Sequence, residues 1–185
     1  MDDLALRLQK QQISTEFKPD ADGVPSRSAA RVVVIAADGR VLLARGHDAL
    51  DTSRAWWFTI GGGMEPGEDT RQAAARELAE ETGIVIAPES LEGPVMTRDS
   101  EFVFSSITVR QSETYYLLRV EQASELDDSR WTELERSVVD ELAWITPAEL
   151  HASPVRQYPH DLAQRLEAWT AAWDGSCPHV VENGE

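Results

Sequence analysis

The order of apolar and polar positions predicts a β-hairpin in the first third of the chain. Residues 31–37 are rich in β-branched side chains, and a second apolar run follows at 40–45. Asp38-Gly39 lies between them and tolerates the positive φ of a tight turn. The polar stretch 46–55 is expected to be a loop, and 56–60 a short strand that ends in a glycine triplet.

The clearest helix is predicted over 69–82. Asp69 suits the N-cap, Gln72 three residues later completes a capping box, and Gly83 is typical just beyond a helix C-terminus. Thr146-Pro147-Ala148-Glu149 predicts a second, short, capped helix. A turn over 110–113 is expected to join two of the remaining strands. These strands are predicted at 84–86, 95–97, 101–109, 114–120 and 142–145.

The two ends of the chain differ from its middle. Residues 1–28 show little apolar periodicity and are expected to form a mobile or loosely docked arm, and 174–185 a similar tail. Between them, 29–173 is predicted to be one α/β domain. Its last helix carries an apolar stripe that fits core packing, formed by Leu162, Leu166, Trp169 and Trp173.

Composition narrows the classes of function. A chain of 185 residues with 42% hydrophobic and 27% charged residues fits a soluble globular domain. Its formal net charge of −16 disfavours nucleic acid polymers and anionic membranes as partners. A small phosphorylated ligand stays compatible, because a divalent cation held by carboxylates supplies positive charge locally. With no signal peptide or apolar span and one cysteine, Cys177, a cytoplasmic location is expected.

Three carboxylates share one face of the 69–82 helix. Glu77 and Glu81 are one turn apart, and Glu80 lies about 60° to the other side of Glu77. Like charges at these spacings repel, so an ordinary solvated helix would alternate them with cations. Carboxylate oxygens one turn apart suit a hard divalent cation, which needs oxygen ligands. The three carboxylates therefore fit two interpretations, a site for a divalent cation and a solvated acidic face.

The residues before this face extend it to a longer motif. The motif consists of Gly62, five residues, Glu68, seven residues and Arg76-Glu77-Leu78-Ala79-Glu80-Glu81-Thr82-Gly83-Ile84. It resembles the Nudix box of the Nudix hydrolase family at every defined position. The resemblance implies the Nudix fold, an α/β/α sandwich around a mixed β-sheet. It also implies hydrolysis, dependent on Mg²⁺ or Mn²⁺, of a small nucleotide in which a nucleoside diphosphate is linked to a group X.

The same resemblance assigns residues. Glu77 and Glu81 are implied as the principal metal ligands, with Glu80 and the carbonyl of Gly61 as further ligands. Arg76 and Glu68 are implied to form an ion pair that braces the helix against its loop. Ile60 departs from the family pattern, because many members have proline before the glycines.

The residues leave several questions open. The general base is either Glu77 or Glu80 in the box or a downstream carboxylate, of which Glu113 comes first, ahead of Glu101 and Asp99. Substrate contacts are expected from Arg45, Arg54 and Trp56, which offer cations for phosphates and an indole for stacking. The X group stays undefined, and a homodimer stays open. A non-catalytic Nudix-fold module that binds or senses a nucleotide is the alternative function, although such modules usually lose box carboxylates.

Overall fold

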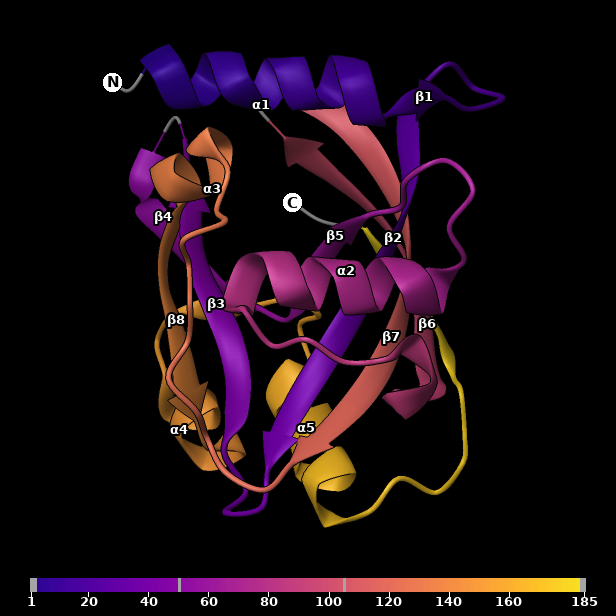
Figure 1. Ribbon diagram of the computed structural model, residues 1–185. Helices are drawn as coiled ribbons and strands as arrows, with labels where there is room; N and C mark the ends of the chain where they lie inside the picture. Colours follow the sequence, from indigo (N-terminus) through magenta and orange to yellow (C-terminus); the bar gives the residue numbers. More distant parts are fainter. Residues whose placement is uncertain (1–2, 50, 105, 184–185) are drawn as a thin grey trace.

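The computed structural model describes residues 3–49, 51–104 and 106–183, and within them ten strands form one curled mixed sheet (Figure 1). The strand order is β10-β6-β7-β2-β3-β4-β9, while β1 and β5 pair with β2 and β8 pairs with β3. The strands are β1 Lys18–Pro19, β2 Pro25–Ala36, β3 Val41–Asp48, β4 Asp51–Phe58, β5 Ile60–Gly63, β6 Glu92–Phe104, β7 Ile107–Val120, β8 Val139–Ile145, β9 Arg156–Gln157 and β10 His179–Asn183. The helices are α1 Asp3–Glu16, α2 Thr70–Thr82, the 3₁₀ helix η1 Pro88–Ser90, α3 Glu133–Val138, α4 Pro147–Ala152 and α5 Leu162–Ala171.

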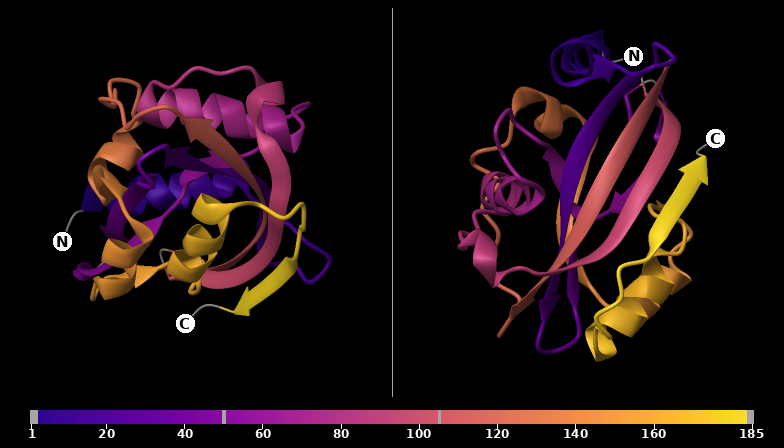
Figure 2. Two further views of the ribbon diagram at one scale, coloured as in Figure 1. Left: turned by 90° about the horizontal axis from the view of Figure 1, so that it is seen from below. Right: turned by 90° about the vertical axis from the view of Figure 1, so that its right-hand side faces the viewer.

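Helices cover both faces of the sheet, which confirms the predicted α/β class (Figure 2). On one face, Leu78 of α2 is fully buried against Val32 and Val34 of β2. On the other face, the predicted stripe of α5 packs on the sheet through Leu162, Leu166 and Trp169. Each fully buried leucine contributes about 2 kcal/mol through the hydrophobic effect. These two cores hold the box helix and the terminal helix on opposite sides of the sheet.

Helix α2 begins and ends where the sequence predicts. The Asp69 carboxylate accepts a hydrogen bond from the Gln72 N–H at 2.9 Å, and the Gln72 side chain accepts one from the Asp69 N–H at 2.9 Å. Gly83 ends the helix with φ 76°, a left-handed conformation that favours glycine. Among the helices of the described residues, none is both long and apolar enough to cross a membrane.

The early hairpin is confirmed, but its continuation differs from the prediction. Val34 pairs with Leu42 across β2 and β3, as the pattern indicates. The expected loop at 46–55 is instead the β3–β4 hairpin, in which His47 pairs with Ala55. Polar side chains do not prevent strand pairing, because the backbone groups form the ladder whatever the side chain is.

The later strands are longer than predicted. β6 and β7 form one antiparallel hairpin that reverses between the paired residues Phe104 and Ile107, so the turn expected at 110–113 is wrong. Residues 110–113 lie inside β7, because they pair with β6 on one side and with β2 on the other. The strand expected at 84–86 is irregular backbone. The strand at 142–145 and the capped helix after it are confirmed as β8 and α4.

Both ends of the chain, which were expected to form a mobile or loosely docked arm and a similar tail, carry regular structure. Helix α1 docks through Ile13 and the following Phe17, which are 6% and 5% exposed and pack around Val109. The loop after β1 is held to β7 by Arg110, whose guanidinium pairs with Asp20 at 2.7 Å. β10 pairs in parallel with β6. Contacts between residues far apart in the chain produce no periodic pattern in either segment, so the sequence does not predict this docking.

Candidate active site

The glycine triplet lies in β5, which pairs antiparallel with β2 and contacts the C-terminal half of α2. Gly61 has φ 131°, which side-chain-bearing residues rarely adopt. A Cβ at Gly62 would lie 2.8 Å from both carboxylate oxygens of Glu77. The backbone of β5 and the carboxylates of α2 approach so closely only because these positions are glycine.

Glu77 and Glu81 point from α2 into this narrow space. The Gly61 N–H donates a hydrogen bond to the Glu81 carboxylate at 3.1 Å. Burial raises the pKa of Glu81 well above its ordinary value, and the charge of Glu77 raises it further. Burial likewise raises the pKa of Glu77, partly offset by Arg76. Two desolvated carboxylates that oppose each other's ionisation form a site that gains from a bound cation.

This pair fits a hard divalent cation by the chemistry of its donors, which are oxygens alone. Among the described residues, no three acidic, histidine or cysteine side chains converge in metal-ligand geometry. Glu80 is 48% exposed and bonds to Arg76, and the Gly61 carbonyl accepts a hydrogen bond from Arg31. Of the four expected ligands, the carboxylates of Glu77 and Glu81 are the two that could hold a cation without first giving up a hydrogen bond from Arg31 or facing solvent.

Arg76 joins the loop to the helix. Its guanidinium donates to both oxygens of Glu68, at 2.8 and 3.0 Å, so the expected ion pair is present. The same guanidinium donates to the carboxylates of Glu77 at 2.9 Å and Glu80 at 3.0 Å, and to the Gly63 carbonyl at 2.8 Å. One planar cation thus fixes two box glutamates against the glycine strand.

Replacing Arg76 by lysine is expected to lower kcat/KM by about 10- to 100-fold, the usual cost of losing a group that orients metal ligands. Lysine keeps the charge but lacks the planar fork that reaches Glu68, Glu77 and Gly63 together. Steady-state kinetics at saturating Mg²⁺ measures the effect. Arg130→Lys, which makes the same change at an exposed position, is the control. Wild-type kinetics in Arg76→Lys would contradict the orienting role.

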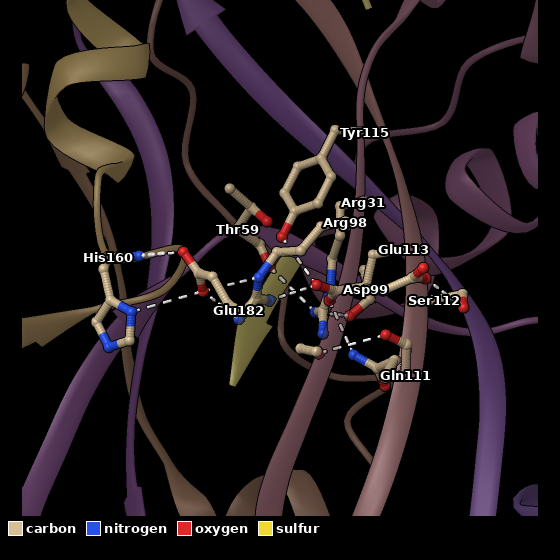
Figure 3. Close-up of polar contacts among 12 residues, drawn as sticks. Arg31, Thr59, Arg98, Asp99, Gln111, Ser112, Glu113, Tyr115, His160 and Glu182 are labelled. Atoms are coloured by element: carbon tan, nitrogen blue, oxygen red, sulfur yellow. Dashed lines mark hydrogen bonds and ion pairs between the residues drawn. The ribbon is translucent and has the colours of Figure 1, made fainter. Parts of the chain in front are cut away.

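Glu113 has a different place from the one predicted. It is 3% exposed and accepts hydrogen bonds from Arg31 at 2.7 Å and from Arg98 (Figure 3). Gln111 and Tyr115 donate to it as well, at 2.8 and 3.1 Å. Burial acts to raise the pKa of Glu113, but the two arginines more than offset this and hold it below its ordinary value. A carboxylate that is held by four donors and has a lowered pKa is a weak proton acceptor, which argues against the expected role of Glu113 as the general base.

The other two downstream carboxylates are also engaged in pairs. Glu101 pairs with Arg110 at 2.8 Å. Asp99 accepts a hydrogen bond from Ser112 at 2.6 Å. Neither of them lies beside the glycine strand, whereas Glu77 does, so the box carboxylates stay candidates for the base.

A cavity of about 220 Å³ is lined by residues of β2, β4, β6 and β7 together with residues near both ends of the chain. Two of the three predicted substrate residues line it, namely Arg54 and Trp56. Arg45 does not line it and instead pairs with Glu141 on β8 at 3.3 Å. The strand order explains the difference, because Arg45 lies on β3 between β4 and β8.

Three further arginines in the cavity wall escaped the sequence analysis: Arg27, Arg31 and Arg98. Arg27 and Arg31 are four residues apart on β2, and this even spacing places them on one face of the strand. That spacing is a signal the sequence does contain. Arg98 could not be found in the same way, since its partners Glu113 and Glu182 lie far along the chain.

The curled mixed sheet and the helix that carries the box agree with the fold that the resemblance implies. A model of the family described as NUDIX domain matches residues 25–166, so the chain belongs to the NUDIX family. Several relatives are named RNA pyrophosphohydrolases. An RNA pyrophosphohydrolase of Novosphingobium aromaticivorans is 30% identical over 136 residues, which cover 69% of this chain and 82% of the relative.

Other comparisons cover less of a relative or show the fold alone. An RNA pyrophosphohydrolase of Sphingopyxis alaskensis is 46% identical over 65 residues, and the match spans 35% of this chain and 39% of that protein. The MutT protein of Methanosarcina mazei Go1 superposes with a TM-score of 0.54 at 21% identity, covering 79% of this chain and 96% of that chain. The dihydroneopterin triphosphate pyrophosphohydrolase of E. coli gives a TM-score of 0.53 at 22% identity, over 78% and 94%.

Proposed function

We propose that this protein is a Mg²⁺-dependent (or Mn²⁺-dependent) pyrophosphohydrolase of small nucleotides in which a nucleoside diphosphate is linked to a group X. The observation that carries the proposal is the pair of desolvated carboxylates, Glu77 and Glu81, under the glycine strand. Next to them on β2, the Arg31 guanidinium reaches the Gly61 carbonyl. Anionic ligands for a cation and cations for phosphates thus meet at one strand.

Glu77, Glu81 and the Gly61 carbonyl would hold the cation, with Glu80 as a further ligand or the base. When bound, the cation neutralises phosphate oxygens and acidifies the attacking water. Arg31 and Arg27 lie along the path from the glycine strand to the cavity, where their guanidinium groups would neutralise charge on the polyphosphate.

We propose that Glu80 is the general base, which accepts the proton of the attacking water. Its carboxylate is the exposed one of the three and shares Arg76 with Glu77, so it meets solvent at the edge of the buried pair. Glu77 and Glu81 are better suited to binding the cation, because their desolvated negative charges are stabilised most by a positive charge between them.

A substrate panel tests the proposal. Nucleoside triphosphates, nucleotide sugars and dinucleoside polyphosphates are incubated with the purified protein, with Mg²⁺ or with EDTA, and phosphate and pyrophosphate release is measured. The expected result is metal-dependent turnover of at least one class. A folded protein that binds nucleotides but cleaves none of them would favour the non-catalytic binding module.

The names of the relatives support a second candidate, the 5′ end of RNA. The net charge of −16 opposes a long polyanion but not a single triphosphate end. A short 5′-triphosphorylated RNA, beside the matching free nucleoside triphosphate, separates the two. We expect the free nucleotide to have the higher kcat/KM at physiological salt, and the reverse order would assign the RNA end as the substrate.

A further inference from the structure

We propose that α1 and β10, which lie outside the matched NUDIX domain, complete a pocket for the nucleobase of the substrate and so determine which nucleotide is preferred. The inference rests on the proposed function. Most of the cavity wall comes from β2, β4, β6 and β7 of the matched domain. The wall also includes Gln9 of α1, Phe17 just after it and Glu182 of β10, and none of these three residues lies within 25–166.

The end of α1 lies at the cavity and, through Arg27, is linked to the glycine strand β5. The Arg27 guanidinium lies 4.6 Å from the centre of the Phe17 ring, and it also pairs with Glu16. Arg27 itself lies against β5, since a Cβ at Gly63 would be 3.2 Å from its Nη1. The docked end of α1 therefore holds an arginine between the glycine strand and the cavity.

The C-terminal strand closes the cavity from another side. The Glu182 carboxylate accepts hydrogen bonds from Arg98, with an N–O distance of 2.9 Å from Nε, and from the His160 N–H at 2.9 Å (Figure 3). Arg98 is 8% exposed and bonds to Glu113 as well. β10 thereby ties the far wall of the cavity to the buried network that contains Arg31.

The balance of charge in the wall indicates what the cavity accepts. Arg27 pairs with Glu16, and Arg31 and Arg98 share Glu113, so each of these guanidinium groups has an acidic partner. Inside the cavity, an anionic group therefore gains less than it does at the glycine strand, where Arg31 bonds to Gly61 and Arg27 lies against Gly63. The polyphosphate belongs at that strand, where a divalent cation would add further positive charge to the two guanidinium groups.

The aromatic residues indicate a flat, uncharged ring. Trp56 and Tyr158 meet edge to face in the wall, with ring centroids 6.2 Å apart. Phe58 of the same strand as Trp56 adds an apolar ring, and Phe17 and Phe102 add two more from other segments. A volume of about 220 Å³ is below the ~300–1,000 Å³ of pockets that enclose a whole drug-sized ligand. A nucleobase meets both requirements, because it is planar, neutral and smaller than the nucleotide.

The test compares the full-length protein with Phe17→Ala, Phe17→Leu and Glu182→Gln. The four ribonucleoside triphosphates are assayed beside methyl triphosphate, which has the phosphoanhydride but no base. In Phe17→Ala, the ratio of kcat/KM for the preferred nucleotide to that for methyl triphosphate is expected to fall about tenfold, through KM, because the loss of the ring removes apolar wall and the contact that positions Arg27. Phe17→Leu keeps apolar volume without the flat ring and should show the same loss if Phe17→Ala fails to fold.

The controls distinguish a failure of the nucleobase pocket from a failure of the proposed function. Glu182→Gln is expected to lower the ratio less, because Arg98 keeps Glu113, and Lys10→Ala on the exposed side of α1 should leave it unchanged. If the wild-type protein cleaves neither nucleotides nor methyl triphosphate, the proposed function fails. If it cleaves both and the Phe17 and Glu182 variants keep the wild-type ratio, the nucleobase pocket is overturned while the function stands.

Discussion

Replacing Glu81 by glutamine is expected to lower kcat/KM for the preferred nucleotide by at least about 100-fold. Loss of an outer-shell group alone costs about 10- to 100-fold in metal affinity or activity, and Glu81 is assigned to the cation itself. A neutral amide keeps the size of the side chain but removes one of the two buried negative charges that a divalent cation needs.

The same substitution is expected to raise the thermal unfolding midpoint measured without divalent metal. Without a cation, burial and the charge of Glu77 disfavour the ionised form of Glu81. Replacing this carboxylate by a neutral amide removes that unfavourable charge and should therefore stabilise the fold. Added Mg²⁺ should then raise the midpoint of the wild-type protein but not that of Glu81→Gln, because a ligand stabilises only the state that binds it. Lower activity together with higher apo stability distinguishes a site residue from a structural one.

Glu89→Gln provides the matched control. Glu89 is exposed on η1, so the same chemical change there should leave both the kinetics and the response to Mg²⁺ at wild-type values. The ligand assignment would be refuted by a Glu81→Gln protein that retains full activity or that Mg²⁺ stabilises as much as the wild type.

The elements that sequence analysis predicted well are those specified locally. Asp69, Gln72 and Gly83 set the ends of α2 through hydrogen bonds and dihedral angles within a few residues. The Asp38-Gly39 turn does the same for the first hairpin, in which Ile35 pairs with Val41. The box combines such a helix with the glycine strand just before it in the chain, so the sequence alone shows both parts as one continuous motif.

The cavity could not be predicted in the same way, because its parts come together only in the folded sheet. Glu113 lies between Arg31 and Arg98 because β2 and β6 flank β7, with Arg31 82 positions earlier in the chain. By its own segment it resembled a solvated loop carboxylate. Phe17 and Glu182 gain their place from the docking of the two chain ends, which no local pattern announces.

Replacing Glu113 by glutamine is expected to lower the free energy of unfolding at pH 7 by about 3–5 kcal/mol, the usual cost of removing one partner from a buried ion pair. The Glu113 and Arg31 side chains are 2% and 14% exposed, so the change leaves a buried guanidinium uncompensated. Arg98 keeps Glu182 and loses less. Urea unfolding measures the effect. Glu101→Gln, a half-exposed pair on the same hairpin, should cost less than about 1 kcal/mol.

The pH dependence of this difference follows from the lowered pKa of Glu113, which Arg31 and Arg98 maintain against the effect of burial. A carboxyl group whose folded pKa is below its unfolded value, about 4.3, stabilises the fold fully above that value and loses this contribution as pH falls through the folded pKa. The gap between wild type and Glu113→Gln should therefore be constant from pH 8 to about 5.5 and shrink below about pH 4. A gap as large at pH 3 as at pH 7 would mean that the variant is destabilised by lost packing, and that the charge of Glu113 does not hold the two arginines.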